Sequence, residues 1–182
     1  MKKETQKIMF SKSTKETDEW ETPKDLFDKL DAEFHFTLDA AASDKNHLCS
    51  KYYTEETNSL IQDWTGEVAF CNPPYSSELQ REFVKKAYEE ARKPGTTCVL
   101  LLPARTDTKL FHEYCMKAAE IRFIKGRVKF GLPPGSTAKQ NSAPFPSMIV
   151  VFSWIGGKNP KVSTYELPKR IKNVRKTSKR KA

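Results

Sequence analysis

The chain has 182 residues, of which 37% are hydrophobic and 11% aromatic, and its formal net charge is +9. This length predicts one domain with a core of its own, and the aromatic content argues against general disorder. No stretch approaches the roughly 20 apolar residues of a membrane span, and residues 1–19 lack the apolar segment of a secretory signal.

The positive charge is concentrated at the end of the chain. Residues 167–182 hold eight Lys and Arg side chains and no acid, which leaves 24 basic against 23 acidic side chains elsewhere. Such a run is either a solvated end or an arm that binds a polyanion. We therefore expect a flexible leader (1–19), one domain (20–166) and a basic tail (167–182).

The first half of the domain alternates between helix and strand signals. Thr22 and Pro23 predict an N-cap followed by proline at the first helical position, for a helix over about 23–33. An apolar segment over 36–39 predicts a short strand that ends in an acid, and 43–66 is rich in loop residues. The apolar run 68–71 predicts a second strand, stopped by two prolines.

The second half continues the alternation. Helical spacing is found over 77–92 and 107–119, and apolar runs predict strands over 97–102, 121–124 and 148–152. Residues 131–146 are rich in Gly, Pro, Ser and Asn and predict a loop. Helices that connect successive strands predict an α/β fold with an open, mostly parallel sheet flanked by helices.

Cysteine and histidine spacing gives no sign of a metal or a redox pair. The cysteines are Cys49, Cys71, Cys98 and Cys115. None of them forms a C-x-x-C pair, and His35, His47 and His112 have no spacing typical of metal ligands. We expect no metal, and buried, reduced thiols in a cytoplasmic protein.

The most informative tetrapeptide is Asn72-Pro73-Pro74-Tyr75, which follows the strand predicted over 68–71. Ligands bind beyond the carboxyl ends of strands in open α/β sheets. The prolines lack N–H donors, so the groups that point outward are acceptors, namely the Asn72 side-chain oxygen and the Pro73 carbonyl. Two acceptors suit the hydrogens of an amino group on a planar ring, on which Tyr75 would stack. A plainer reading is that Pro-Pro-Tyr ends a strand or forms a proline-rich ligand.

This tetrapeptide resembles the [DNS]-P-P-[YF] motif of amino methyltransferases that use S-adenosylmethionine. More closely, the chain resembles the phage-type DNA N-6-adenine methyltransferase (Dam) family over about residues 20–152. The similar segments are WETPKDLFD (20–28), FHFTLDAAAS (34–43), DW (63–64), CNPPYS (71–76), LLPARTDT (101–108), GRVKF (126–130) and PSMIVVF (146–152).

The resemblance implies a Rossmann-like, S-adenosylmethionine-dependent methyltransferase fold and methyl transfer to the N-6 amino group of adenine in double-stranded DNA. The adenine would be flipped out of the duplex into a pocket at Asn72-Pro73-Pro74-Tyr75. The implied catalytic residues are Asn72, Pro73, Pro74 and Tyr75. The implied cofactor-binding residues are Thr22, Pro23, Asp39, Ala40, Ala41 and Asp63. The implied location is the cytoplasm of a bacterium or a phage-infected cell.

Each cofactor assignment has a structural alternative. Thr22 is equally well explained as an N-cap. The alternative for Asp39 is a turn residue at the end of the strand, and the alternative for Trp64, beside Asp63, is a core residue. Many such enzymes have a glycine-rich loop after the first strand, whereas residues 40–42 are all alanine here. We therefore expect this loop to use ordinary backbone angles.

Basic residues give candidate DNA contacts. Arg105 follows the strand predicted over 97–102, and Arg127 and Lys129 alternate along an extended segment. The candidates in the tail are Lys169, Arg170, Lys172, Arg175 and Lys176. The alternative for residues 105–108 is a helix cap, with Asp107 as the preferred capping residue.

Three functions remain open. The family resemblance and the basic tail favour DNA adenine methylation, with cytosine as a variant because its amino group fits the same acceptors. A protein glutamine methyltransferase would use the same motif, since a carboxamide is also planar. The third possibility is a DNA-binding protein without catalysis, whose cofactor site has degenerated.

Overall fold

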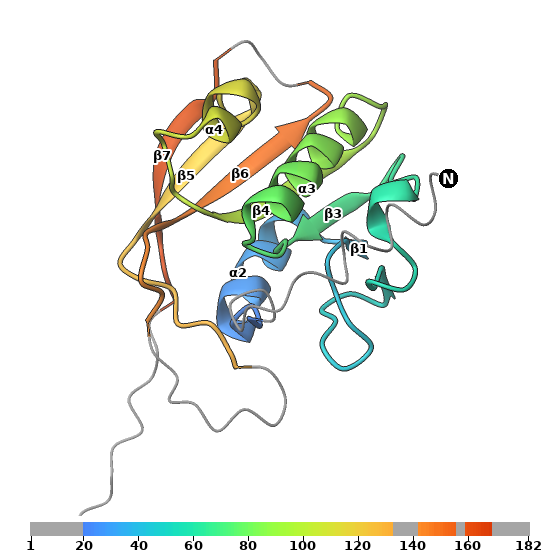
Figure 1. The fold of residues 1–182 in the computed structure, drawn as a ribbon, viewed down its shortest axis with the longest axis horizontal. Helices are drawn as coiled ribbons and strands as arrows, with labels where there is room; N and C mark the ends of the chain where they lie inside the picture. The colour runs from blue at the N-terminus through green and yellow to red at the C-terminus, as the bar shows by residue number, and fades with distance from the viewer. Residues whose placement is uncertain (1–19, 133–141, 156–158, 169–182) are drawn as a thin grey trace, which may run out of the picture.

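A computed structural model describes residues 20–132, 142–155 and 159–168 (Figure 1). Its strands are β1 (Leu38–Asp39), β2 (Lys51–Tyr52), β3 (Val68–Cys71), β4 (Thr97–Pro103), β5 (Glu120–Lys125), β6 (Ser147–Ser153) and β7 (Lys161–Glu166). Its helices are α2 (Lys24–Phe34), α3 (Ser77–Glu90) and α4 (Lys109–Glu113), with 3-10 turns η2 (Ser59–Ile61) and η3 (Cys115–Lys117). None of these helices is long and apolar enough to cross a membrane.

The strands form one mixed, mostly parallel sheet in the order β2-β1-β3-β4-β6-β5-β7. Strands β2, β1, β3 and β4 are parallel, and β7 is parallel to β5. Only β6 runs against its neighbours, β4 and β5. The predicted Rossmann-like α/β sheet is therefore confirmed, and the carboxyl ends of β1, β3 and β4 meet at one edge.

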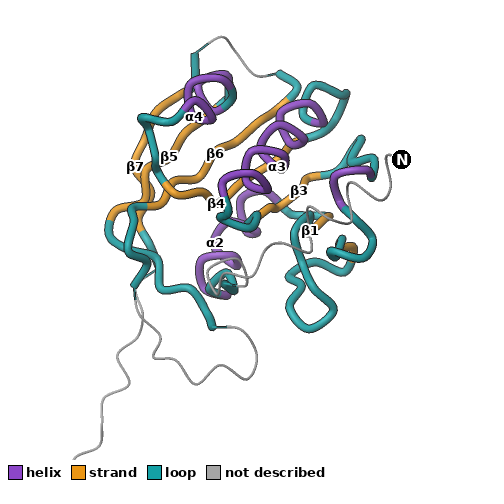
Figure 2. The backbone as a smooth tube through the Cα atoms, viewed as in Figure 1, coloured by secondary structure: helices purple, strands orange, loops and turns teal. Residues whose placement is uncertain are grey.

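Alternating side chains of β4 divide the core between the two faces of the sheet. Leu100 and Leu102 pack in the cluster that contains α3 and α4. Val99 and Leu101 pack in the cluster that contains α2. Figure 2 shows α3 and α4 together on the near face of the sheet. Full burial of a Val or Leu side chain contributes about 1.5–3 kcal/mol to the stability of the folded state. Strand β4 therefore stabilises the core on both faces of the sheet.

Both predicted helix caps differ from the structure. Pro23, not Thr22, is the N-cap of α2: its ψ of 129° is extended, and the helix begins at Lys24. Thr108, not Asp107, is the N-cap of α4, because its hydroxyl accepts the Phe111 N–H at 3.3 Å.

The helix predicted over 107–119 is also shorter than expected. It ends at Glu113 because Tyr114 leaves helical geometry, and a 3-10 turn follows. The structure adds two strands that the sequence did not predict, β2 and β7.

Other expectations about the core are confirmed. All four cysteines are buried and free of disulfides. Burial raises the pKa of the Cys49 and Cys115 thiols to about 12, so they stay protonated. Trp64 is fully buried, and its indole N–H donates to the Ser59 carbonyl. The predicted leader, most of the basic tail and residues 133–141 of the predicted loop lie outside the described residues.

Candidate active site

Strand register brings the predicted cofactor loop beside the Asn-Pro-Pro-Tyr segment. Asp39, the last residue of β1, pairs with Phe70 of β3, two residues before Asn72. The Ala40 N–H continues this ladder by donating to the Phe70 carbonyl at 2.8 Å. Residues that lie thirty or more positions apart in the sequence thus become neighbours at the carboxyl edge of the sheet.

The Asn72 carboxamide is bonded at both ends. Its Nδ2 donates to the Trp20 carbonyl at 3.2 Å, and its Oδ1 accepts from the Tyr75 hydroxyl at 2.8 Å. The same hydroxyl lies 3.3 Å from the Leu101 carbonyl of β4. The amide is therefore held between the segment before α2 and the strand next to β3.

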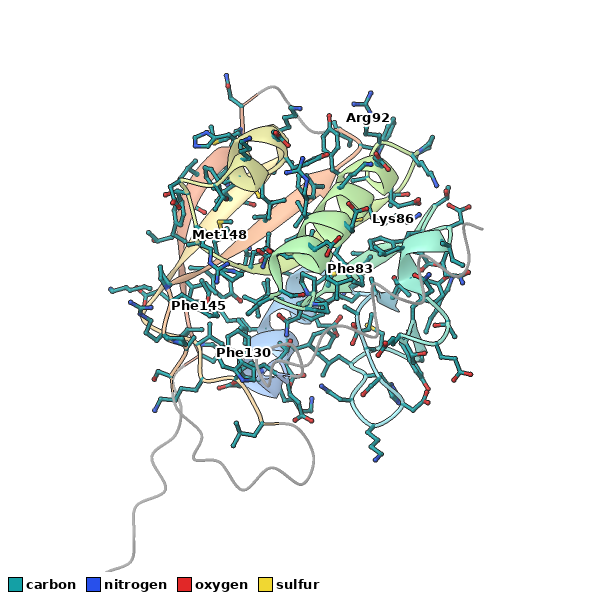
Figure 3. The ribbon with its side chains drawn as sticks, viewed as in Figure 1. Phe83, Lys86, Arg92, Phe130, Phe145 and Met148 are labelled. Atoms are coloured by element: carbon teal, nitrogen blue, oxygen red, sulfur yellow. The ribbon has the colours of Figure 1, made fainter. Side chains whose placement is uncertain are left out.

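Aromatic rings enclose Tyr75, a residue that is only 7% exposed. Trp20, Phe130 and Phe145 approach it edge to face, with ring centroids 5.5–6.4 Å away. Trp20 in turn stacks on Phe130 and Phe145 at 5.2 and 5.8 Å. Figure 3 labels Phe130 and Phe145 at the same end of the molecule. The stacking of Tyr75 on a ligand stays a prediction; the structure shows that its ring is buried and that its hydroxyl contacts Asn72.

A short backbone bridge holds Trp20 against this cluster. The Glu21 N–H donates to the Gly131 carbonyl at 3.2 Å, and the Gly131 N–H donates back at 2.8 Å. A Cβ added at Gly131 would lie 2.8 Å from the Glu21 Cβ, so the close approach requires glycine. The bridge joins the residues before α2 to the segment after β5.

Asp39 organises the alanine loop. Asp39 is 4% exposed, and its carboxylate accepts the Leu48 N–H at 3.0 Å and the Ala41 N–H at 3.3 Å. Among the described non-glycine residues only His35 and Asn58 have positive φ, so the loop does use ordinary backbone angles, as predicted. Burial outweighs these hydrogen bonds and raises the pKa of Asp39 from 3.8 to about 6.

This shift makes a prediction about stability. Between about pH 4 and pH 6, Asp39 is protonated in the folded chain and ionised in the unfolded chain, so a rise in pH disfavours folding. Relative to Asp39→Asn, which carries no charge, wild type should lose on the order of 3 kcal/mol of unfolding free energy across this window. Denaturant titrations of both proteins from pH 4 to 7 measure the difference. A difference that stays constant with pH would contradict the assignment.

The structure separates the remaining cofactor candidates. Thr22 is buried and Pro23 half-buried, and both follow Trp20 at the carboxyl edge. Asp63 lies before β3, at the other end of that strand, and its carboxylate accepts from Lys93 at 2.8 Å and from the Thr65 hydroxyl at 2.6 Å. These bonds lower the pKa of Asp63. Asp63 is therefore not brought together with Asn72 and Asp39.

Two groups of basic candidates lie in the described chain. Arg105 is exposed just after β4, with its guanidinium 5.9 Å from the centre of the Phe145 ring. Arg127 and Lys129 are exposed and alternate with buried Val128 and Phe130, as an extended segment requires. The tail candidates Lys169, Arg170, Lys172, Arg175 and Lys176 lie outside the described residues.

Sequence reasoning missed the aromatic cluster. Trp20, Phe130 and Phe145 are far apart in the sequence, and only the fold brings them to Tyr75. One local signal was available, because the apolar members of the alternating segment 126–130 had to face something buried. In the described ranges, no group of three or more His, Cys, Asp or Glu side chains is arranged to hold a metal ion.

Comparison with known proteins gives consistent matches. The model of the family described as DNA N-6-adenine-methyltransferase (Dam) matches residues 11–176. A DNA N-6-adenine-methyltransferase of Escherichia phage T1 is 39% identical over 110 residues, which are 59% of this chain and 45% of that protein. A DNA N-6-adenine-methyltransferase of Haemophilus phage HP1 is 33% identical over 151 residues, which are 80% of this chain and 85% of that protein. The chain thus matches less than half of the phage T1 protein.

Proposed function

The chain belongs to the DNA N-6-adenine-methyltransferase (Dam) family, and from that premise we propose that it methylates the N-6 amino group of adenine in double-stranded DNA, using S-adenosylmethionine. The observation that carries the proposal is the placement of Asn72. It follows β3 at the carboxyl edge of the parallel strands, with its carboxamide held by Trp20 and Tyr75. Ligands of open α/β sheets bind at this edge.

Asn72 and Pro73 orient the target in this proposal. When bound, S-adenosylmethionine supplies an electrophilic methyl group on its sulfonium. The Asn72 Oδ1 and the Pro73 carbonyl accept the two amino hydrogens of an adenine that has left the duplex. Both bonds weaken conjugation of the nitrogen lone pair with the ring, so the pair can attack the methyl carbon. The carbon–sulfur bond breaks as the carbon–nitrogen bond forms, and its electron pair stays on sulfur, which leaves as a neutral thioether. The proton leaves the nitrogen afterwards, and no strong base is needed.

Residues around Asp39 fit a cofactor at the same edge. Ala40 and Ala41 are small, and they follow a strand end beside β3, where a ligand can approach the backbone closely. The buried Asp39 carboxylate supplies negative charge for an ammonium group and holds the loop in shape. Thr22 and Pro23 complete the proposed set. Asp63 is left out because Lys93 and Thr65 already bind its carboxylate.

We expect Asp39→Ala to weaken S-adenosylmethionine binding strongly, because the variant loses both the charge and the bonds that hold the loop. Calorimetry on the purified variant and on wild type measures the effect. Asp39→Asn separates the two causes, since it removes the charge while keeping an acceptor of similar shape. If wild type shows no heat and no thermal shift at millimolar cofactor, DNA binding without catalysis becomes the better reading.

The proposed DNA surface comprises the described basic residues Arg105, Arg127 and Lys129 and the tail. Arg105 is the best placed of these, because its contact with Phe145 joins it to the aromatic cluster around Tyr75. A cationic side chain beside the aromatic cluster suits a phosphate that flanks a flipped nucleotide.

The function is tested with methyl-labelled S-adenosylmethionine and duplexes with and without adenine, followed by nucleoside analysis. We expect label in N-6-methyladenine only, and none in the duplex without adenine. Label in cytosine would show that the target base is cytosine and not adenine. Label in glutamine of an added protein extract, with none in DNA, would replace the proposal with the protein methyltransferase. DNA binding without any labelled product would leave only the non-catalytic reading.

A further inference from the structure

We propose that Tyr75 is a positioning residue, whose hydroxyl fixes the Asn72 carboxamide for the target amine. The inference rests on the proposed methyl transfer and gives Tyr75 a role different from ring stacking. Its basis is the contact from the Tyr75 hydroxyl to the Asn72 Oδ1 at 2.8 Å, which is shorter than the 3.3 Å to the Leu101 carbonyl. A phenol has one hydrogen to donate, so the shorter contact is the principal one.

The two ends of the Asn72 amide have partners of opposite kind. Nδ2 donates to the Trp20 carbonyl, and Oδ1 accepts from Tyr75. One acceptor and one donor together decide which end of the amide carries the oxygen, so the flipped orientation is disfavoured. A carbonyl oxygen has two lone pairs, and Tyr75 uses one of them. The second stays available for a hydrogen of the target amine.

Burial of Tyr75 makes its hydroxyl a permanent donor. The ring is enclosed by Trp20, Phe130 and Phe145, and this burial raises the pKa of Tyr75 well above its ordinary value. The hydroxyl therefore keeps its proton at neutral pH. Its Leu101 contact ties it to β4, the central strand of the sheet, in which all residues after Thr97 are buried. The Tyr75 hydroxyl thus connects the Asn72 side chain, which lies outside β3, to the backbone of β4.

Tyr75→Phe tests the idea because it keeps the ring and removes only the hydroxyl. A stacking role predicts a rate equal to wild type. A positioning role predicts a single-turnover rate about 2–10-fold lower, the worth of one neutral hydrogen bond, with KM for DNA and cofactor unchanged. In an Asn72→Ala background, Tyr75→Phe should have no further effect, because the group through which it acts is gone.

Tyr165→Phe is the matched control. Tyr165 is also buried, and its hydroxyl has no hydrogen-bond partner in the described structure, so the same deletion should leave the rate unchanged. A wild-type rate for Tyr75→Phe would overturn the proposal. So would a loss of the same size in the Asn72→Ala background as in wild type.

A second readout does not depend on activity. In 15N-labelled protein, the side-chain NH2 resonances of Asn72 are assigned by their absence in Asn72→Asp. Tyr75→Phe should shift these resonances, and Tyr165→Phe should leave them in place. Unshifted resonances in Tyr75→Phe would overturn the positioning role. If wild type methylates no duplex, the proposed function fails, and this measurement alone decides the inference.

Discussion

Asn72→Ala is expected to lower the single-turnover rate of DNA methylation by about 10²–10³, the usual cost of losing a hydrogen bond that strengthens in the transition state. The variant should still bind cofactor and melt near wild type. Asn72 is half-buried just outside β3, so its truncation opens no large cavity. The Tyr75 hydroxyl keeps an acceptor, the Leu101 carbonyl. The lost hydrogen bonds should cost only about 1 kcal/mol each.

Asn72→Asp distinguishes a chemical defect from a structural one. A carboxylate oxygen can accept from Tyr75 and from the target amine in the same place. However, the second oxygen would face the Trp20 carbonyl, which now accepts from Nδ2 at 3.2 Å. We expect partial activity and a somewhat lower melting temperature. Wild-type rates from Asn72→Ala would rule out the proposed mechanism, even for a chain that methylates DNA.

The strands that carry the site could be predicted because they are apolar on both faces. The run over 68–71 ends at two prolines, and β3 has the same bounds. The runs over 97–102 and 148–152 fall within β4 and β6. β7 escaped prediction because Tyr165 is its only buried side chain, so it shows no apolar run. β2 is two residues long and exists through its pairing with β1.

The segment 107–119 shows that buried residues at helical spacing do not require one continuous helix. Phe111, Cys115 and Ala118 are all buried at roughly helical spacing, which is the pattern that the sequence displayed. The backbone nevertheless leaves α-helical geometry at Tyr114 and continues as a 3-10 turn. Periodicity indicates which residues of a segment are buried. It does not show that one set of helical hydrogen bonds continues along the whole segment.

The candidate site was predictable where it depended on strand ends. Asp39 ends β1 and Asn72 follows β3, and these strands are parallel neighbours, so their meeting at one edge follows from the fold class. The contact of Tyr75 with Trp20 was not predictable, because it depends on the pairing of Glu21 with Gly131, far apart in the sequence. For Asp63, a place in the sequence similar to the family's does not by itself give a place at the carboxyl edge, because its carboxylate pairs with Lys93 before β3.

Deletion of residues 169–182 is expected to weaken DNA binding strongly at low salt. The deletion removes eight basic side chains and reduces the net charge from +9 to +1. Each phosphate contact contributes about −0.9 to the slope of log K against log salt, so the tail accounts for up to about −7. The truncated chain keeps β7 and the bond from Lys29 to the Glu166 carbonyl, so it should fold and bind cofactor as wild type does.

The matched control keeps the length of the tail and replaces its eight Lys and Arg residues by Gln. Because the polyelectrolyte effect depends on charge and not on chain length, this variant should reproduce the shallow salt dependence of the truncation. Binding titrations at several salt concentrations measure both slopes. If the glutamine variant binds like wild type, the tail acts through something other than charge. If both variants keep the wild-type slope, the electrostatic contacts lie elsewhere, with Arg105, Arg127 and Lys129 the described candidates.

With the tail removed, the methylation rate at saturating DNA should stay unchanged, since every group proposed to orient the amine lies at the carboxyl edge of β1 and β3.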